Sequence, residues 1–194
     1  MKKLLASLLA FLLVFSLCAC TKNEDNQSED TSASISETTD TTATTEQQKP
    51  VIPDAYQLYD NGTLSFYYPN TWNVTDGSIV ILTDLSNGNN ITIVSEPKND
   101  YYAALNTESF NTEMKPMLES MGMAISEASV KQTQNENGLA MTVIVYTAAY
   151  LGTEMTQTQY IVNVDDLTYS VTVTEMVADA VLVETVFDTL NTVS

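Results

Sequence analysis

Tight-turn signals divide residues 51–194 into short apolar runs, and their spacing constrains the fold more than any other feature of the sequence. Asn-Gly and Asp-Gly pairs between apolar runs are strong hairpin signals, and strands joined by tight turns are antiparallel. The turn signals are Asn61-Gly62, Asp76-Gly77, Asn87-Gly88, Asn137-Gly138, Gly152 and Asp165-Asp166. The runs that they separate predict strands at about 63–68, 78–83, 90–95, 124–133, 139–150, 154–164 and 167–174. We therefore expect an α+β fold with an antiparallel sheet of about six or seven strands.

Side-chain alternation within these runs predicts what covers the sheet. Leu139 and Met141 lie on one face of their predicted strand, while Ile144 and Tyr146 lie on the other. A strand that is apolar on both faces is covered on both faces. The run 167–174 differs, because threonine and serine alternate with apolar residues and make one of its faces polar. We therefore expect helices to pack on the faces of the sheet.

One helix is expected over about 107–121. Asn106 or Thr107 can cap its start, and Gly122 suits its end. Pro116 lies inside the segment and cannot donate the backbone hydrogen bond of a continuous helix, so we expect a kink or a split there. The apolar stripe of this helix consists of Phe110, Met114, Met117, Leu118 and Met121.

A second helix is expected over about 178–191. Its many β-branched residues make it a weak helix alone, so it depends on packing against the sheet. Its apolar stripe consists of Val183, Val186, Phe187 and Leu190. The expected order of elements is therefore β-β-β-α-β-β-β-β-α.

The first twenty residues carry an export signal. A positive start is followed by an apolar run at 4–17, which is shorter than the roughly 18 residues of a membrane-spanning helix. The run ends in Leu17-Cys18-Ala19-Cys20, which resembles the lipobox of bacterial lipoproteins. The resemblance implies diacylglycerol transfer to Cys20, removal of residues 1–19 and an anchor of at least two acyl chains. The alternative is an ordinary secretory signal cut after Ala19, which would release a soluble exported protein.

A change of composition separates this signal from the domain. The segment 21–50 holds twelve serine or threonine residues and seven acidic ones, with Ile35 as its one large apolar side chain. Such a segment cannot bury enough surface to offset its ordering entropy. We therefore expect a signal peptide at 1–19, a lipidated cysteine and disordered tether at 20–50, and one globular domain at 51–194.

The element order and one short motif resemble the PsbP-like family. The motif is an aromatic residue followed by Tyr-Pro and then Trp, here Phe66, Tyr68, Pro69 and Trp72. The resemblance implies an antiparallel sheet between helices, with Trp72 filling the core. It implies no activity, since these relatives are mainly non-enzymatic binding or assembly proteins, and the metal-binding histidines of some relatives have no counterpart here.

The composition removes several classes of chemistry. All seven basic residues are lysines, there is no arginine or histidine, and both cysteines lie in the first twenty residues. The domain therefore lacks the residues of a Ser-His-Asp or Cys-His catalytic site, a histidine or cysteine zinc site and an internal disulfide. The net charge of −18 makes the chain a poor nucleic-acid binder.

Two sets of residues suggest a metal ion. Methionine sulfur is a soft ligand suited to Cu(I), although three of the four clustered methionines also share the apolar stripe of a helix. Calcium prefers oxygen ligands, although acids at hairpin ends usually serve the turn. The copper candidates are Met114, Met117, Met121 and Met123, and the calcium candidates are Asp60-Asn61 with Asp165-Asp166.

Two further interpretations of the sequence are an enzyme and a contact surface made of tyrosines. A catalytic site would need a pair of carboxylates or a Ser–Lys dyad, but nothing marks a partner for any lysine of the domain and the acids are scattered. Tyrosines in connecting segments suit a contact surface or, equally, packing on a sheet edge. The lysines are Lys98, Lys115 and Lys131, and the tyrosines are Tyr56, Tyr59, Tyr101 and Tyr102.

These observations favour a lipid-anchored, non-enzymatic binding or assembly module on the extracytoplasmic face of the cell membrane. Its partners would be the membrane, through Cys20, and an unidentified protein or envelope component, with no cofactor and no nucleic acid. A basic partner, or one bridged by divalent cations, would suit the acidic domain. The alternative is a lipoprotein that binds a small ligand or a metal ion, calcium or copper.

Overall fold

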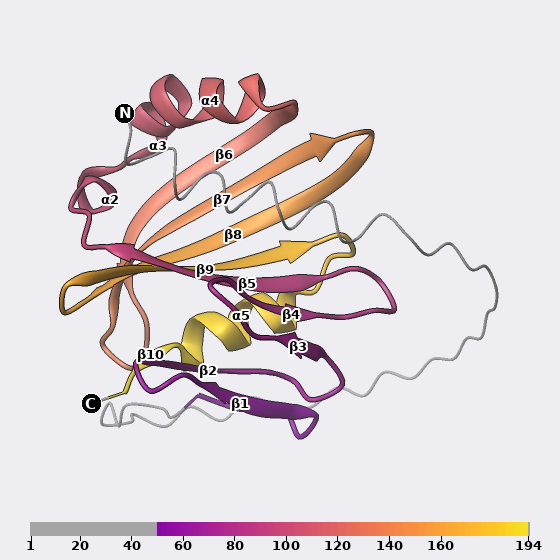
Figure 1. Cartoon of the computed structure of the whole chain (residues 1–194). Helices are drawn as coiled ribbons and strands as arrows, with labels where there is room; N and C mark the ends of the chain where they lie inside the picture. The colour runs from indigo at the N-terminus through magenta and orange to yellow at the C-terminus, as the bar shows by residue number, and fades with distance from the viewer. Residues whose placement is uncertain (1–49, 194) are drawn as a thin grey trace, which may run out of the picture.

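The computed structural model describes residues 50–193, which form two antiparallel sheets and several short helices (Figure 1). The strands are β1 (Tyr56–Asp60), β2 (Leu64–Pro69), β3 (Asn73–Thr75), β4 (Val80–Thr83), β5 (Asn90–Pro97), β6 (Met123–Gln134), β7 (Ala140–Tyr150), β8 (Thr153–Val164), β9 (Leu167–Glu175) and β10 (Asn191–Thr192). The helical elements are α2 (Tyr101–Ala104), α3 (Thr107–Ser109), the π-helical η1 (Phe110–Met114), α4 (Lys115–Ser120) and α5 (Ala180–Thr189). The larger sheet has seven strands in the order β3-β4-β5-β9-β8-β7-β6, and the smaller has the order β1-β2-β10. The expected α+β fold with a seven-stranded antiparallel sheet is confirmed.

Each of the seven predicted runs forms a strand, but one of them lies in the smaller sheet. The run predicted at 63–68 becomes β2, which pairs with β1 and β10. Asn61 closes the β1–β2 hairpin, because its Oδ1 accepts hydrogen bonds from the backbone N–H of Thr63 at 3.0 Å and of Leu64 at 2.8 Å. The sequence did not predict β1, β3 and β10, which have five residues or fewer.

The main apolar core lies between the seven-stranded sheet on one side and α5 with the smaller sheet on the other (Figure 1). Trp72 is 6% exposed within it, so its expected role as core filling is confirmed. Residues from the seven-stranded sheet, the smaller sheet and α5 with its C-cap meet here with no exposed surface: Leu64, Phe66, Leu82, Ile91, Val171, Val173, Leu182, Val186 and Leu190. One continuous core therefore joins both sheets.

A helical layer made of α2, α3, η1 and α4 covers the opposite face of the large sheet over β6 and β7. Asn106 caps the start of α3, since the Asn106 Oδ1 accepts a hydrogen bond from the backbone N–H of Ser109 at 3.0 Å. The helix expected at 107–121 is split, because η1 ends with the N–H of Lys115 bonded to the carbonyl of Phe110, directly before Pro116. No helix within residues 50–193 combines the length and the apolar character needed to cross a membrane.

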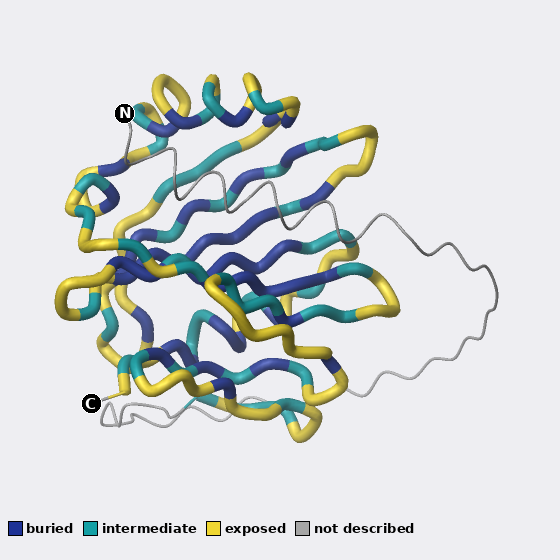
Figure 2. The backbone as a smooth tube through the Cα atoms, in the orientation of Figure 1, coloured by how far each residue is buried: buried dark blue, intermediate teal, exposed yellow. Residues whose placement is uncertain are grey.

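The polar face of β9 is buried rather than exposed to solvent, as Figure 2 shows for the centre of the large sheet. Tyr146 donates its hydroxyl hydrogen to Gln157, and the Tyr146 oxygen accepts from Gln159 at 3.2 Å. Gln157 in turn donates to Thr174 of β9 at 3.1 Å. Buried polar groups are stable only when such bonds satisfy them, so this network fixes the register of the central strands.

Two side chains hold the first half of helix α5. Asp179 caps its start by accepting a hydrogen bond from the N–H of Leu182 at 3.0 Å. The hydroxyl of Tyr160 reaches from β8 and donates to the carbonyl of Val183 at 2.8 Å. The helix is shorter than the expected 178–191, because β10 follows it directly and pairs with β2.

Candidate functional site

The four clustered methionines pack into the second apolar core, which lies under the helical layer. Met114 is 5% exposed and Met123 is 2% exposed, and both contact the cluster that contains Phe110. Met117 and Met121 are half-buried against the same cluster. Their burial is what a helix that packs its apolar face on a sheet requires, and this packing accounts for the methionine spacing.

The two acidic turns proposed for calcium serve their own hairpins. Asp60 accepts a hydrogen bond from the N–H of Gly62 at 2.7 Å. Asp165 has a positive φ of 51°, and the carbonyl of Asp166 accepts from the N–H of Lys98 at 2.8 Å. Within residues 50–193, no group of three or more acidic, histidine or cysteine side chains is placed to hold a metal ion. The structure therefore does not bring these turns together as a calcium site.

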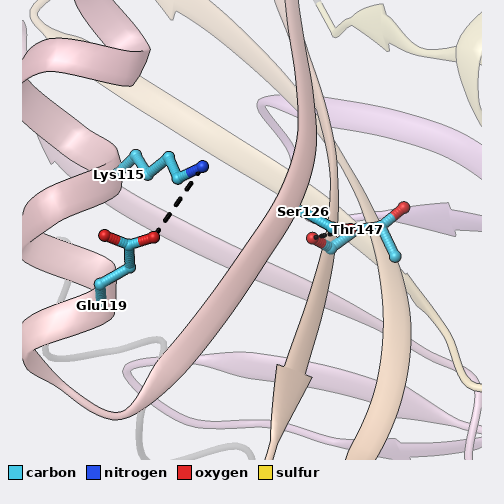
Figure 3. Close-up of polar contacts among 4 residues, drawn as sticks. All are labelled: Lys115, Glu119, Ser126 and Thr147. Carbon is cyan, nitrogen blue, oxygen red and sulfur yellow. Dashed lines mark hydrogen bonds and ion pairs between the residues drawn. The ribbon is translucent and has the colours of Figure 1, made fainter.

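None of the lysines in the described part of the chain is hydrogen-bonded to a serine. Lys115 forms an ion pair with Glu119 on its own helix at 3.9 Å (Figure 3). The same view shows Ser126, whose hydroxyl donates to the carbonyl of Thr147 at 3.4 Å. Ser126 stands at an irregularity in the β6–β7 register, and Lys98 and Lys131 are exposed. The geometry of a Ser–Lys dyad is not present among these residues.

Two of the four tyrosines are buried, and the other two are half-buried. None of them lies in a connecting segment, contrary to the expectation from the sequence: Tyr56 and Tyr59 belong to β1, and Tyr101 and Tyr102 belong to α2. The ring centre of Tyr59 is 5.1 Å from that of Phe66 in the main core. Tyr102 is 6% exposed, whereas Tyr56 and Tyr101 are half-buried. Burial, the hydrogen bond from the Tyr101 hydroxyl to Glu113 and the charge of that carboxylate together raise the pKa of Tyr101 to about 12. Tyr59 and Tyr102 therefore serve packing, and no continuous tyrosine surface forms from the four.

Cys20, the predicted site of lipidation, lies outside the described residues, as do the signal peptide at 1–19 and all of the predicted tether at 20–50 except Pro50. These expectations remain predictions.

A surface hollow of about 270 Å³ lies beside α5, and we call it the α5 groove. It combines apolar and acidic side chains from three parts of the chain: the start of the domain, the β6–β7 loop and the outer face of α5. Its lining consists of Pro50, Val51, Pro53, Glu136, Val181, Glu184, Thr185 and Asp188.

Two asparagines hold the β6–β7 loop against the end of α5. Asn135 is 6% exposed, and its Nδ2 donates to the carbonyls of Phe187 at 2.8 Å and Leu190 at 2.6 Å. Asn137 donates from Nδ2 to the carbonyl of Asp188 at 3.0 Å. These bonds satisfy carbonyl groups at the helix C-terminus that would otherwise lack intrahelical partners. They also hold Glu136, which lies between the two asparagines, at the edge of the groove.

Like charges meet in the α5 groove. Glu184 and Asp188 are four residues apart on α5, a spacing that places side chains side by side on a helix. Burial raises the pKa of the Asp188 carboxyl, and the charges of Glu136 and Glu184 raise it further. Asp188 also lies in the last turn of α5, where the helix dipole disfavours negative charge. The groove is therefore acidic, and Asp188 is the carboxyl group whose pKa responds to the other two.

Sequence reasoning missed this groove. The spacing of Glu184 and Asp188 on a predicted helix was a visible signal of repulsion on one face. Glu136 carried no such signal, because it comes from a hairpin loop whose position beside α5 depends on the contacts of Asn135 and Asn137.

Comparison with solved structures identifies the architecture. No protein-family model and no curated protein matches the sequence. The solution structure of cyanobacterial PsbP (CyanoP) from Synechocystis sp. PCC 6803 is 18% identical, and the match covers 73% of this chain and 95% of that one with a TM-score of 0.53. The fold is PsbP-like. At 18% identity, the similarity between this chain and CyanoP concerns the fold alone.

Two further similarities are more distant. A crystal structure from Bacteroides thetaiotaomicron VPI-5482 is 16% identical, with a TM-score of 0.41 over 66% of this chain and 44% of that one. A Pseudomonas aeruginosa protein of unknown function is 14% identical, with a TM-score of 0.34 over 61% of this chain and 81% of that one. Both scores are too low to add to the PsbP-like assignment.

Proposed function

We propose that this protein is a membrane-anchored extracytoplasmic lipoprotein whose PsbP-like domain acts as a non-enzymatic binding module. The anchor is supported by the lipobox-like Leu17-Cys18-Ala19-Cys20 at the end of an export signal. The binding role is supported by the surface charge of the domain and by the α5 groove. The domain supplies recognition, and the acyl chains on Cys20 supply attachment to the bilayer.

The observation that carries the binding role is the excess of acidic over basic side chains. Residues 51–194 contain eighteen acids and three lysines, a net charge of −15. Among the described residues, the ion pairs between side chains amount to one, Lys115 with Glu119. A surface of this kind attracts basic partners and repels anionic lipid head groups, so the domain itself would not adhere to the membrane.

The anchor is tested by comparing the two cysteines. A Cys20→Ser variant should lose the acyl modification and move from the membrane fraction to the soluble or precursor fraction. A Cys18→Ser variant should remain lipidated, because residue 18 is removed with the signal. Intact-mass analysis and membrane fractionation distinguish the two variants, and an unmodified N-terminus in the unaltered protein would rule out the anchor.

The binding role is tested by capture from solubilised cell envelopes. The lipidated full-length protein should retain a specific partner at low salt and release it at high salt, because screening weakens contacts between opposite charges. A partner that is retained equally at both salt concentrations, or the absence of any specific partner, would contradict an electrostatic binding module.

A further inference from the structure

We propose that the Asn61-Gly62 turn is a self-modification site, at which the side-chain amide of Asn61 is lost as ammonia and an aspartate or isoaspartate residue forms. The reaction needs only water, and the β1–β2 hairpin itself holds the groups that promote it. The inference goes beyond the proposed function, because it depends neither on the lipid anchor nor on a binding partner.

The reaction begins with attack of the Gly62 backbone nitrogen on the side-chain carbon Cγ of Asn61, an approach that glycine allows because it has no Cβ. The nitrogen gives up its proton, and the new C–N bond closes a five-membered succinimide ring. The C–N bond to the Asn61 amide breaks, and the amide leaves as ammonia with a proton that balances the one lost from Gly62. Water then opens the ring at either carbonyl, which yields aspartate or isoaspartate.

A carboxylate is placed to accept the proton from the attacking nitrogen. The backbone N–H of Gly62 donates to Oδ1 of Asp60 at 2.7 Å. A general base takes up a proton at this kind of distance. The Cβ position of Gly62 has no neighbouring atom within 4 Å, so nothing obstructs the closure of the ring. Asp60, Asn61 and Gly62 are all exposed, so water reaches the site and ammonia can leave it.

Two backbone N–H groups stabilise the charge that develops on Asn61. As the nitrogen attacks Cγ, negative charge builds up on Oδ1 of the Asn61 side chain. That oxygen accepts hydrogen bonds from the N–H of Thr63 at 3.0 Å and from the N–H of Leu64 at 2.8 Å. Both distances are those of donors in an oxyanion hole, which stabilise a tetrahedral intermediate. The bonds that close the hairpin therefore also activate the amide for attack.

The departing amide lies beside a tyrosine hydroxyl. Burial raises the pKa of Tyr59 above its ordinary value, and a side-chain hydrogen bond with Asn61 opposes this rise. A hydrogen bond lowers the pKa of a tyrosine when the tyrosine oxygen accepts it, so the donor on Asn61 is the amide nitrogen Nδ2. The protonated hydroxyl of Tyr59 is therefore within reach of Nδ2 and can donate a proton to the departing ammonia.

The other Asn-Gly pairs of the domain, Asn87-Gly88 and Asn137-Gly138, have different hydrogen bonds. The N–H of Gly88 donates to the backbone carbonyl of Asp84 at 2.9 Å, and the N–H of Gly138 donates to that of Asn135 at 3.0 Å. A peptide carbonyl is a far weaker base than a carboxylate, so neither bond activates the glycine nitrogen. Exposure does not distinguish the three sites, because all three asparagines are exposed. The hydrogen bonds therefore select Asn61.

The products differ from the native turn in charge and, for isoaspartate, in the length of the backbone. Aspartate adds a negative charge beside Asp60, whereas isoaspartate inserts a methylene group into the main chain. The longer backbone moves the acceptor oxygen away from the N–H groups of Thr63 and Leu64. Leu64 has no exposed surface and pairs with β10, so we expect isoaspartate to loosen the smaller sheet.

The experiment incubates the purified full-length protein at neutral pH and follows each asparagine over time by peptide mapping with mass spectrometry. Fragmentation by electron transfer separates isoaspartate from aspartate. Asn61 should convert at least about tenfold faster than Asn87 or Asn137 in the same sample. The protein is also incubated in urea, which removes the hydrogen bonds of the turn. There Asn61 should convert more slowly than in the folded protein, and the three rates should converge.

Asp60→Asn separates a base from a simple acceptor, because it keeps an oxygen for the N–H of Gly62 and removes the carboxylate. It should slow the conversion of Asn61 at least about tenfold. Glu136→Gln is the matched control, since Glu136 precedes Asn137 as Asp60 precedes Asn61 but does not receive the glycine N–H. It should leave the rate at Asn137 unchanged.

The proton donor is tested with Tyr59→Phe, which keeps the packed ring and removes the hydroxyl. This variant should also release ammonia from Asn61 more slowly than the unaltered protein. Unchanged conversion at Asn87 and Asn137 in the same digest shows that a variant is folded, because these sites report on the rest of the domain.

Three results would overturn the inference. Equal conversion at the three asparagines of the folded protein would mean that the turn has no special reactivity. Faster conversion of Asn61 in urea than in the folded protein would mean that the structure protects the amide. Conversion of Asp60→Asn at the rate of the unaltered protein would remove the base on which the reaction depends.

Discussion

On its inner face, α5 and its C-cap present Leu182, Val186 and Leu190, which have no exposed surface, whereas the outer face carries Val181, Glu184 and Asp188 in contact with solvent. The inner residues bury apolar area against both sheets, which stabilises the folded chain. The outer residues place two like charges four residues apart, one of them, Asp188, in the last turn near the negative end of the helix, which opposes folding. One helix of ten residues therefore carries apolar packing on one face and acidic charge on the other.

The largest effect should come from the inner face. Leu182→Ala should lower the free energy of unfolding by about 2–5 kcal/mol, because it removes buried methyl groups and leaves a cavity between α5 and the large sheet. Val181→Ala, one residue away on the outer face, should change it by less than about 0.5 kcal/mol. Urea unfolding followed by circular dichroism measures both, and equal losses would contradict the division of the helix into two faces.

The next effect should come from Asn135, which joins the β6–β7 loop to the end of α5. Asn135→Ala should lower the free energy of unfolding by about 1–3 kcal/mol, because the carbonyls of Phe187 and Leu190 would lose their side-chain partner in a buried position. Asn137→Ala is the control, since its bond to the Asp188 carbonyl is exposed and should contribute less than about 1 kcal/mol. If both variants unfold at the same urea concentration, the loop is not held mainly by Asn135.

On the outer face, removing a charge should stabilise the protein. Asp188→Asn should raise the free energy of unfolding by about 0.3–1 kcal/mol at neutral pH, a small gain because Asp188 is partly exposed and solvent screens its charge. Glu154→Gln, on an exposed position of β8, should give no comparable gain. A loss of stability on Asp188→Asn would mean that the carboxylate has a structural role.

The gain from Asp188→Asn should depend on pH. The pKa of Asp188 is raised in the folded protein, first by burial and then by the charges of Glu136 and Glu184. The folded chain therefore keeps this proton to a higher pH than the unfolded chain, and the stability linked to it falls as the pH rises through that interval. The advantage of the variant should be complete at pH 7 and should disappear below about pH 4, the ordinary range of aspartate. Urea midpoints at a series of pH values test this, and a gain that grows on acidification would have the wrong sign.

The smallest effect should come from salt. Raising sodium chloride from about 0.05 to about 0.5 M should stabilise the unaltered protein more than a variant that combines Glu184→Gln and Asp188→Asn, by roughly 0.5 kcal/mol or less, because repulsion on the outer face of α5 is screened. Equal stabilisation of both proteins would place the relevant repulsion elsewhere on the acidic surface.

The strands of the large sheet could be predicted from the sequence because their turns are local. Asn137-Gly138, Gly152 and Asp165-Asp166 lie between β6, β7, β8 and β9, which are antiparallel neighbours in the sheet. The short strand β10 could not be predicted, since its two residues carry no periodicity and its partners, Leu64 and Ser65, lie more than a hundred residues earlier. Tyr59 was assigned to a connecting segment for a similar reason, because β1 exists through its pairing with β2.

The candidate site, like the strands, could be predicted only in part from the sequence. The sequence revealed an acidic domain and a helix with two acids four residues apart, but it did not indicate that Glu136 would join them. The methionines and the acidic turns, which the sequence made conspicuous, serve packing and turn geometry instead. Residue type alone does not distinguish a ligand from a packing residue, because both use the same side chains.

What the sequence determined by itself is what neighbouring residues decide: the positions of the tight turns, the apolar stripes of both helices, the split before Pro116 and the excess of acidic charge. The tertiary structure decided that β2 leaves the large sheet, that the polar face of β9 is buried and that three distant carboxylates line one groove. The physical reason is that turns and helices depend on interactions over a few residues. The meeting of distant elements depends instead on the packing free energy of the whole domain, to which every buried side chain contributes.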